Sequence, residues 1–196
     1  MVIPNPEWKR KENGQGWVGG DTVQMAIGQG FVLVTPLQMA CFTASVARDE
    51  VWTQPTILHQ PDRPRQQTER IGLTPAHRTA LLRAMEQVTL TGTARILTDG
   101  KVLPKIPGLT IAGKTGTAQK DVYHEGKKGT INFAWFIGFA PVENPQIAIA
   151  IAIEGDTPGE ETGGGRYAAP VAHAILKTWA EKRSQPASRS VRFKTE

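Results

Sequence analysis

Residues 146–154 read Gln-Ile-Ala-Ile-Ala-Ile-Ala-Ile-Glu, and this stretch gives the clearest indication of how the chain folds. The isoleucines and alanines alternate strictly, which is the two-residue period of a β-strand with one bulky face and one small face. Alanine adds little bulk, so a helix can approach the small face closely. We expect the helix that follows in the sequence to occupy this face.

A second strand is predicted just before the first, at 132–140. The turn between them, 141–145, has five residues, which is too short for a crossover, so the two strands must run antiparallel. A third strand is predicted at 109–119, and a polar loop at 120–131 should connect it to the second. These segments together predict an antiparallel sheet.

Helices are predicted on both sides of the strands in the sequence. Threonine-proline pairs at 35–36 and 74–75 start two of them, because threonine is a good N-cap and proline suits the first helical position. The first should end near Arg48, and a closing helix should open near 169–170. Helices, antiparallel strands and a closing helix together predict an α+β fold.

The remaining segments are expected to be short or irregular. Residues 1–20 are polar and rich in Gly, Pro and Trp, which predicts a loop. Residues 51–58 suit a short edge strand, since Pro55 excludes a central one. The second helix should break at 89–94, and a short helix is expected to continue to Leu97.

The composition fits one domain. The chain has 196 residues, and its 39% hydrophobic content is enough for a buried core. The domain is expected to span 1–182, followed by a basic flexible tail at 183–196 that carries much of the net charge of +5. Contact of the tail with anionic lipid or peptidoglycan is the alternative to a solvated tail. It lacks the interleaved aromatic residues that would favour nucleic acid.

No targeting or membrane-spanning segment is evident in the sequence. The first residues lack the long apolar region of a signal peptide, and no apolar run reaches the roughly 18 residues that span a bilayer. The single cysteine, Cys41, excludes an internal disulfide and is expected to be buried.

The stretch Lys114-Thr115-Gly116-Thr117 carries the strongest functional signal. A cationic side chain and two hydroxyls around a small residue suit the recognition of a carboxylate. Lys-Thr-Gly is one of three short motifs of penicillin-binding proteins and serine β-lactamases, the others being Ser-x-x-Lys and Ser-x-Asn or Ser-Asp-Asn.

A phosphate-binding loop is the rival interpretation of the same stretch. Residues 108–115 match the expression Gly-x-x-x-x-Gly-Lys-Thr, which is typical of ATPases. Such a loop needs a strand before its first glycine and a helix after its threonine. Residues 101–107 are a poor strand, and 116–126 lack an apolar helical stripe, so the context argues against an ATPase.

Several separated segments, in the same order, resemble class B penicillin-binding proteins, and most closely their elongation-type branch, penicillin-binding protein 2. The resemblance extends from about residue 4 to residue 182. It implies a partial penicillin-binding protein and serine β-lactamase-like transpeptidase fold, with an antiparallel sheet and flanking helices. The segments that carry it are Pro6-Glu7-Trp8-Lys9, Trp17, Gly20-Asp21-Thr22, Ile27-Gly28-Gln29-Gly30, Thr35-Pro36-Leu37-Gln38-Met39, Gly113-Lys114-Thr115-Gly116-Thr117-Ala118-Gln119, Trp135-Phe136-Ile137-Gly138-Phe139-Ala140-Pro141, Gly163-Gly164-Gly165 and Ala168-Ala169-Pro170-Val171.

The resemblance implies acyl transfer. A serine attacks the D-Ala-D-Ala carbonyl of a stem peptide, or the ring of a β-lactam, and an amine of a second stem peptide resolves the acyl-enzyme. Lys114 would supply positive potential and join the proton network, while the Thr115 and Thr117 hydroxyls would bind the terminal carboxylate. Gly116 would let substrate lie close to the strand, and the Thr117 amide would form half of an oxyanion hole.

The resemblance also implies partners and a location. The partners are the peptidoglycan stem peptide, in a lipid-linked precursor or a glycan strand, β-lactams, a missing N-terminal half, and membrane proteins of the elongation complex. No nucleic acid is expected. The implied location is the periplasmic face of the bacterial inner membrane.

The nucleophile motif is absent from this sequence. No serine has a lysine three positions later, and Ser45 is followed at that distance by Arg48, which cannot act as a base because it does not deprotonate. Family order places Ser-x-x-Lys and Ser-x-Asn upstream of residue 1. The chain alone is therefore expected not to be a transpeptidase. The alternatives are a non-catalytic remnant or interaction module, and a β-lactamase or D,D-carboxypeptidase.

No metal or cofactor is expected. The histidines, His59, His77, His124 and His173, lack a zinc-type spacing. The acidic residues at 154–161 are interpreted as a solvated loop. By resemblance, Asp21 and Gln29 shape the wall of the site, and a purely structural turn role is the alternative. Trp135 is expected in the core rather than at the substrate.

Overall fold

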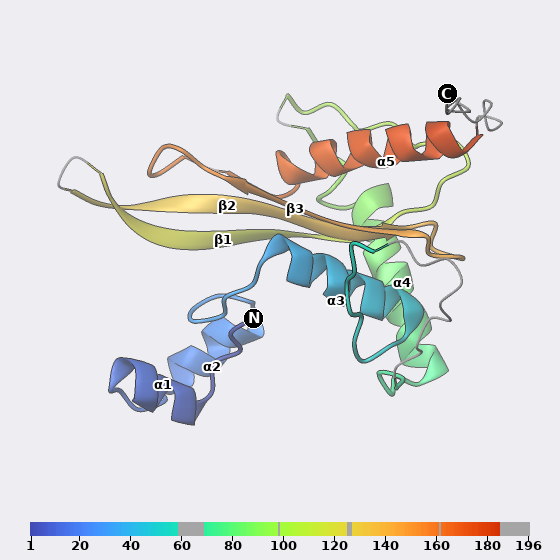
Figure 1. The fold of residues 1–196 in the computed structure, drawn as a ribbon. Coiled ribbons are helices and arrows are strands. Elements are labelled where there is room, and N and C mark those ends of the chain that lie inside the picture. Colours follow the sequence, from blue (N-terminus) through green and yellow to red (C-terminus); the bar gives the residue numbers. More distant parts are fainter. Residues whose placement is uncertain (59–68, 98, 125–126, 161, 185–196) are drawn as a thin grey trace, which may run out of the picture.

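The computed structural model describes residues 1–58, 69–97, 99–124, 127–160 and 162–184 (Figure 1). Within these residues an antiparallel three-stranded sheet forms the centre, in the order β1-β2-β3. Its strands are β1 Ala112–His124, β2 Lys127–Ala140 and β3 Ile147–Glu154. Thr115 lies opposite Phe136, which in turn lies opposite Ile151. The predicted antiparallel sheet and α+β class are confirmed.

Helices cover both faces of the sheet (Figure 1). Helix α5, Ala168–Ser184, lies on one face against β2 and β3. On the other face, α3, Pro36–Arg48, contacts β2 and β3, and α4, Pro75–Leu90, contacts β1. The two predicted helix starts are confirmed, since Thr35 Oγ1 accepts from the Gln38 N–H and Thr74 Oγ1 from the His77 N–H, both at 3.2 Å.

The helix expected on the alanine face of β3 packs instead on its isoleucine face. Ile149 is buried with Ala169, Ala172 and Leu176 of α5. On this face the small residues are the alanines of α5, which leave room for the bulky isoleucines of β3. Helix α3 takes the alanine side, where Ala148 packs against the cluster around Ala47.

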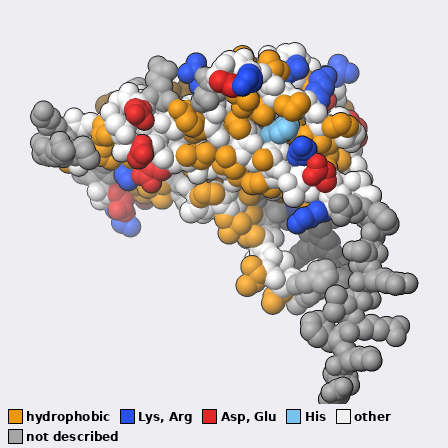
Figure 2. All heavy atoms as spheres, turned by 90° about the horizontal axis from the view of Figure 1, so that it is seen from above, with side chains coloured by type: hydrophobic (Ala, Val, Ile, Leu, Met, Phe, Trp, Pro, Cys, Tyr) orange, Lys and Arg blue, Asp and Glu red, His pale blue; other side chains and the backbone are white. Residues whose placement is uncertain are grey.

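The outer side of α5 remains partly apolar. Tyr167, just before the helix, and Val171 and Ile175 within it keep 42–43% of their surface exposed. Figure 2 views the molecule from the α5 side and shows hydrophobic side chains across this face. No helix among the described residues is both long and apolar enough to cross a membrane.

The prediction of a loop at 1–20 was wrong, because two helices form near the N-terminus. They are α1, Pro6–Asn13, and α2, Gly19–Ala26. Asn5 Oδ1 accepts from the Trp8 N–H at 2.7 Å, which is an N-cap with proline behind it. The same cap-and-proline pattern is present in the sequence at 5–6 and would have found α1.

Three further expectations need correction. The loop expected at 120–131 is a hairpin, because β1 continues to His124 and β2 begins at Lys127, with Lys128 paired to Asp121 across it at 2.8 Å. Residues 51–58 form no strand, and among the described residues a backbone bond runs from the Val51 N–H to the Glu69 carbonyl. The short helix to Leu97 is replaced by turns and a bridge between Ile96 and Val102.

Helix α5 continues past residue 183, where the tail was predicted to begin. Helix α5 extends through Ser184, so Arg183 and Ser184 are helical rather than part of a tail. Residues 185–196 lie outside the described part of the chain. Cys41 is a free thiol that is half-buried rather than fully buried.

A buried ion pair joins α1 to α2. Lys9 Nζ lies 2.7 Å from Asp21 Oδ2, and the two side chains are only 6% and 11% exposed. Lys9 also lies 5.5 Å from the centroid of the Phe31 ring. The hydrogen bond from Lys9, followed by that from the Val18 N–H, holds the pKa of Asp21 below its ordinary value.

We expect Asp21→Asn to lower the midpoint of thermal unfolding at neutral pH. Because the pKa of Asp21 is lowered in the folded chain, its stabilisation is present above the unfolded value of about 4 and is lost as the pH falls through the folded value. The difference between variant and wild type should therefore shrink below pH ~4. Thermal melts from pH 7 to pH 2 measure it, with Glu12→Gln on exposed α1 surface as control. A difference that stays constant across this range would contradict the assignment.

Candidate functional site

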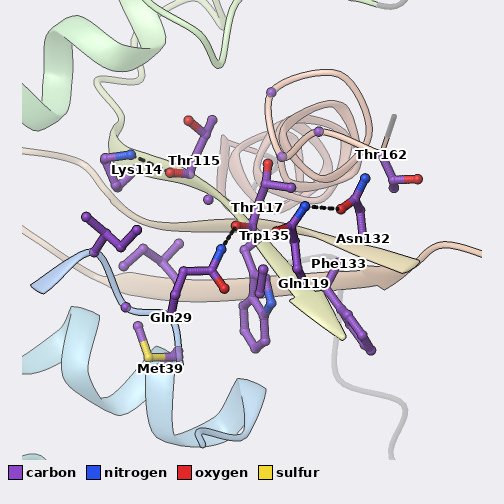
Figure 3. Close-up of a pocket in the computed structure, with 18 of the residues that line it drawn as sticks. Gln29, Met39, Lys114, Thr115, Thr117, Gln119, Asn132, Phe133, Trp135 and Thr162 are labelled. Atoms are coloured by element: carbon purple, nitrogen blue, oxygen red, sulfur yellow. Dashed lines mark hydrogen bonds between the residues drawn. The ribbon is translucent and has the colours of Figure 1, made fainter. Parts of the chain in front are cut away.

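A groove of about 1410 Å³ follows β1 and contains the Lys-Thr-Gly stretch (Figure 3). Segments far apart in the sequence line it. They are the loop 27–34, β1 at 114–120, parts of β2 between 132 and 137, and the turn 162–166, together with Met39, Thr93 and Ile96.

The outer edge of β1 presents its backbone to this groove. In an antiparallel pair, alternate residues point their N–H and C=O groups away from the partner strand. Three carbonyls on this side receive side-chain donors: Ile111, just before β1, from Thr89 Oγ1 at 2.7 Å, Thr115 from Lys114 Nζ at 2.5 Å, and Thr117 from Gln29 Nε2 at 2.9 Å. The Thr117 N–H points to the same side as its carbonyl, into the groove.

The two candidate hydroxyls share one face of β1. Thr115 and Thr117 are two residues apart in the strand, so their side chains project from the same side, as Figure 3 shows. Lys114 projects from the other side and turns back to the Thr115 carbonyl. The structure thus places one ammonium group and two hydroxyls around the same strand edge.

The groove favours an anion. Lys114, Lys120 and Arg166 line it, while none of its described lining residues is Asp or Glu. Among the described residues, the positive charge of Lys120 is partly balanced by Glu154, whose Oε1 lies 3.6 Å from Lys120 Nζ. A carboxylate entering the groove therefore meets excess positive charge and hydroxyl donors, which supports the carboxylate recognition predicted from the sequence.

Gly116 is shielded from the α5 side by a glycine turn that the sequence had not singled out as functional. Gly164 is buried, and a Cβ atom built on it would collide with the carbonyl oxygens of Gly116 and Trp135. A Cβ on Gly116 itself would only touch Trp135 Cβ at 3.4 Å. The close backbone approach at this position is therefore made by Gly164.

Two other lining residues differ from expectation. Trp135 was expected in the core, but it is half-buried and lines the groove. Thr93 was not predicted at all, and its hydroxyl lies 2.8 Å from Thr115 Oγ1. Gln29, for which two roles were open, contacts β1 directly, whereas Asp21 acts through the α1–α2 ion pair.

No serine or cysteine lines the groove among the described residues. Ser45 is 6% exposed on α3 and lies 3.0 Å from Thr53 Oγ1. Ser184 donates back to carbonyls of α5. Ser188 and Ser190 lie outside the described residues.

A phosphate-binding loop is excluded by the local structure. Residues 108–111 form a turn and its exit, and from Ala112 the chain is continuous strand through Lys114 and Thr115. No helix follows Thr115, so no helix N-terminus is available for phosphate. The described residues contain no cluster of three or more His, Cys, Asp or Glu side chains that could hold a metal ion. His59 lies outside those residues.

The chain matches the penicillin binding protein transpeptidase domain over residues 5–177. The chain therefore belongs to the family of penicillin-binding protein transpeptidase domains.

Two curated relatives of the chain are peptidoglycan D,D-transpeptidases. The chain is 31% identical to the peptidoglycan D,D-transpeptidase MrdA of Acinetobacter baumannii over 97% of its own length and 29% of the relative's. It is 33% identical to the peptidoglycan D,D-transpeptidase PbpA of Mycolicibacterium smegmatis over 77% of its own length and 30% of the relative's. The chain thus spans under a third of the length of these relatives.

Solved structures agree with the family. Penicillin-binding protein 2 of Helicobacter pylori superposes with a TM-score of 0.66 at 28% identity, over 94% of this chain and 31% of that one. Penicillin-binding protein A of M. tuberculosis, solved as an imipenem acyl-enzyme complex, gives 0.55 at 27% identity, over 80% of this chain and 33% of that one. The predicted partial penicillin-binding protein fold is confirmed.

Proposed function

We propose that this chain forms the carboxylate-binding side of a peptidoglycan D,D-transpeptidase that acts in cell-wall elongation. The observation that carries the proposal is the edge of β1, where Lys114, Thr115 and Thr117 meet in a groove whose described lining residues include no Asp or Glu. Relatives named as peptidoglycan D,D-transpeptidases support it.

Each residue has a role in the proposed acyl transfer. The substrate is a stem peptide ending in D-Ala-D-Ala. Lys114 supplies positive charge, and the Thr115 and Thr117 hydroxyls donate to the terminal carboxylate. The Thr117 N–H forms half of the oxyanion hole, with the second half and the serine supplied by another part of the enzyme. The serine oxygen attacks the carbonyl carbon, the terminal D-Ala leaves as an amine, and an amine of a second stem peptide releases the acyl group.

The proposal extends to partners and location. The ligands are stem peptides, carried by a lipid-linked precursor or a glycan strand, and β-lactams that resemble them. The proposed location of the whole enzyme is the periplasmic face of the inner membrane. Its proposed partners there are membrane proteins of the elongation complex. The absence of Ser-x-x-Lys from this sequence favours one alternative, a non-catalytic interaction module.

The test is ligand binding by the chain itself. Diacetyl-Lys-D-Ala-D-Ala is titrated into isotopically labelled protein, and the amide signals of Thr115, Gly116 and Thr117 are followed by NMR. We expect these signals to shift at much lower concentrations of the D,D peptide than of its L-Ala-L-Ala isomer or its C-terminal amide. Equal shifts with all three peptides, or none with any, would refute the proposal.

Lys114→Ala should weaken binding of the D,D peptide roughly tenfold, because it removes a charged partner of the carboxylate. The matched control is Lys177→Ala on α5, whose side chain is 58% exposed and remote from the groove. Isothermal titration or NMR gives both dissociation constants. Equal effects of the two substitutions would show that Lys114 contributes only to the net charge.

A further inference from the structure

Thr93 brings a third hydroxyl to the carboxylate-binding edge. It lies after the C-terminal end of α4, 22 residues before Thr115, and its Oγ1 is 2.8 Å from Thr115 Oγ1. Its side chain is exposed to the groove, which it lines together with Thr115 and Thr117. The pairing therefore occurs where ligand would bind and not in the core.

The backbone around Thr93 is held from several sides. A Cβ atom on Gly165 would collide with the Thr93 carbonyl, so the glycine turn packs directly against it. The next residue, Ala94, is 5% exposed, and its N–H donates to the Val88 carbonyl at 3.1 Å. Thr89 ties the end of α4 to the start of β1 through the Ile111 carbonyl. The Thr93 hydroxyl is thus presented by fixed structure.

The hydroxyl pair has a defined use when an anion is present. Each hydroxyl has one proton to donate and can also accept. A carboxylate can only accept, so Thr115 must direct its proton at the ligand. Thr115 Oγ1 can then accept the proton of Thr93, and the chain of bonds runs from Thr93 through Thr115 to the carboxylate. Successive hydrogen bonds of this kind strengthen one another.

We propose that Thr93 is a positioning residue that orients the Thr115 hydroxyl toward the terminal carboxylate of the ligand. Its effect is selectivity for a free carboxylate over a neutral C-terminus. The inference rests on the proposed function, because it assumes that the ligand ends in a carboxylate. Thr93 itself does not touch the reacting carbonyl.

The test compares two ligands across three proteins. Diacetyl-Lys-D-Ala-D-Ala and its C-terminal amide are titrated into wild type, Thr93→Val and Thr93→Ser. Valine keeps the shape of threonine without the hydroxyl, and serine keeps the hydroxyl without the methyl. We expect Thr93→Val to weaken binding of the acid by about three- to tenfold, the range of one hydrogen bond, and to leave the amide unchanged. Thr93→Ser should bind the acid with the affinity of the wild type.

A structural readout accompanies the titrations. Three-bond couplings to the Thr115 γ-carbon should report one χ1 rotamer in wild type and averaging in Thr93→Val. If Thr93→Val does not fold, Thr93→Ala replaces it in the same comparison.

Equal weakening of acid and amide would overturn the positioning role, as would no change in either. These results differ from failure of the proposed function, in which wild type itself would not prefer the acid. If wild type prefers the acid and Thr93→Val retains that preference, only the role of Thr93 is lost.

Discussion

Gly164→Ala should destabilise the chain by about 3 kcal/mol or more, which is the upper range for forcing an extra methyl group into a packed site. The added Cβ would collide with the carbonyl oxygens of Gly116 and Trp135 and would lie 2.9 Å from the Gly116 nitrogen. These are backbone atoms of two paired strands, so no side-chain rotation can relieve the overlap. The sheet and the turn must separate.

The neighbouring glycine supplies a matched control. A Cβ on Gly163 would have no atom within 4 Å, and Gly163 does not have a positive φ angle. Gly163→Ala should therefore unfold at nearly the wild-type urea concentration, while Gly164→Ala should unfold far earlier or not fold. Indistinguishable urea midpoints for the two variants would mean that the turn does not pack on β1 as described.

The second large expected effect concerns acylation by benzylpenicillin, which we expect to be absent from this chain alone. Incubation of the chain with excess benzylpenicillin should leave its intact mass unchanged, because no serine in the sequence has a lysine three residues later. Under the proposed function, the acylated serine belongs to another part of the enzyme. A separate transpeptidase segment that carries Ser-x-x-Lys should then acquire the adduct when this chain is added.

The controls for this experiment separate its outcomes. The serine-bearing segment alone should be acylated slowly, and Lys114→Ala in the added chain should abolish the acceleration. An adduct on the isolated chain, mapped by peptide mass to one of its own serines, would show that the chain carries its own nucleophile. No acceleration on mixing would favour the non-catalytic interaction module.

Local sequence chemistry was sufficient for much of the fold. The alternation at 146–154 predicted β3, and the short turn after 132–140 fixed its direction relative to β2. The caps at Thr35 and Thr74 lie where threonine precedes proline. These features depend on neighbours in the chain, and the signal is therefore present within a few residues.

Features that depend on tertiary contacts were missed. The hairpin between β1 and β2 has polar residues, so it was predicted as a loop. The backbone pairing of the two strands holds it together, and the ion pair Lys128–Asp121 lies across it. The packing of α5 on the isoleucine face depends on alanines in the helix, which periodicity in β3 alone does not reveal.

In the candidate site, too, the features set by local sequence were predicted and most of those set by tertiary contacts were not. The Lys-Thr-Gly stretch could be found by motif, because its residues are consecutive. Thr93, Gln29 and Gly164 come to the same groove from three distant segments. Gln29 was expected at the wall of the site by resemblance alone. Nothing in the local sequence of Thr93 or Gly164 states that they contact β1, so only the folded chain identifies these two.

The side-chain bonds along β1 also affect how the molecule behaves in solution. A strand at the edge of a sheet offers unpaired carbonyls to any extended chain, which is a common route to aggregation. Along this edge the carbonyls of Ile111, just before β1, and of Thr115 and Thr117 within it already accept from Thr89, Lys114 and Gln29. A strand of another molecule would have to displace these donors before it could pair. The contacts that shape the groove therefore also protect this edge from non-specific association.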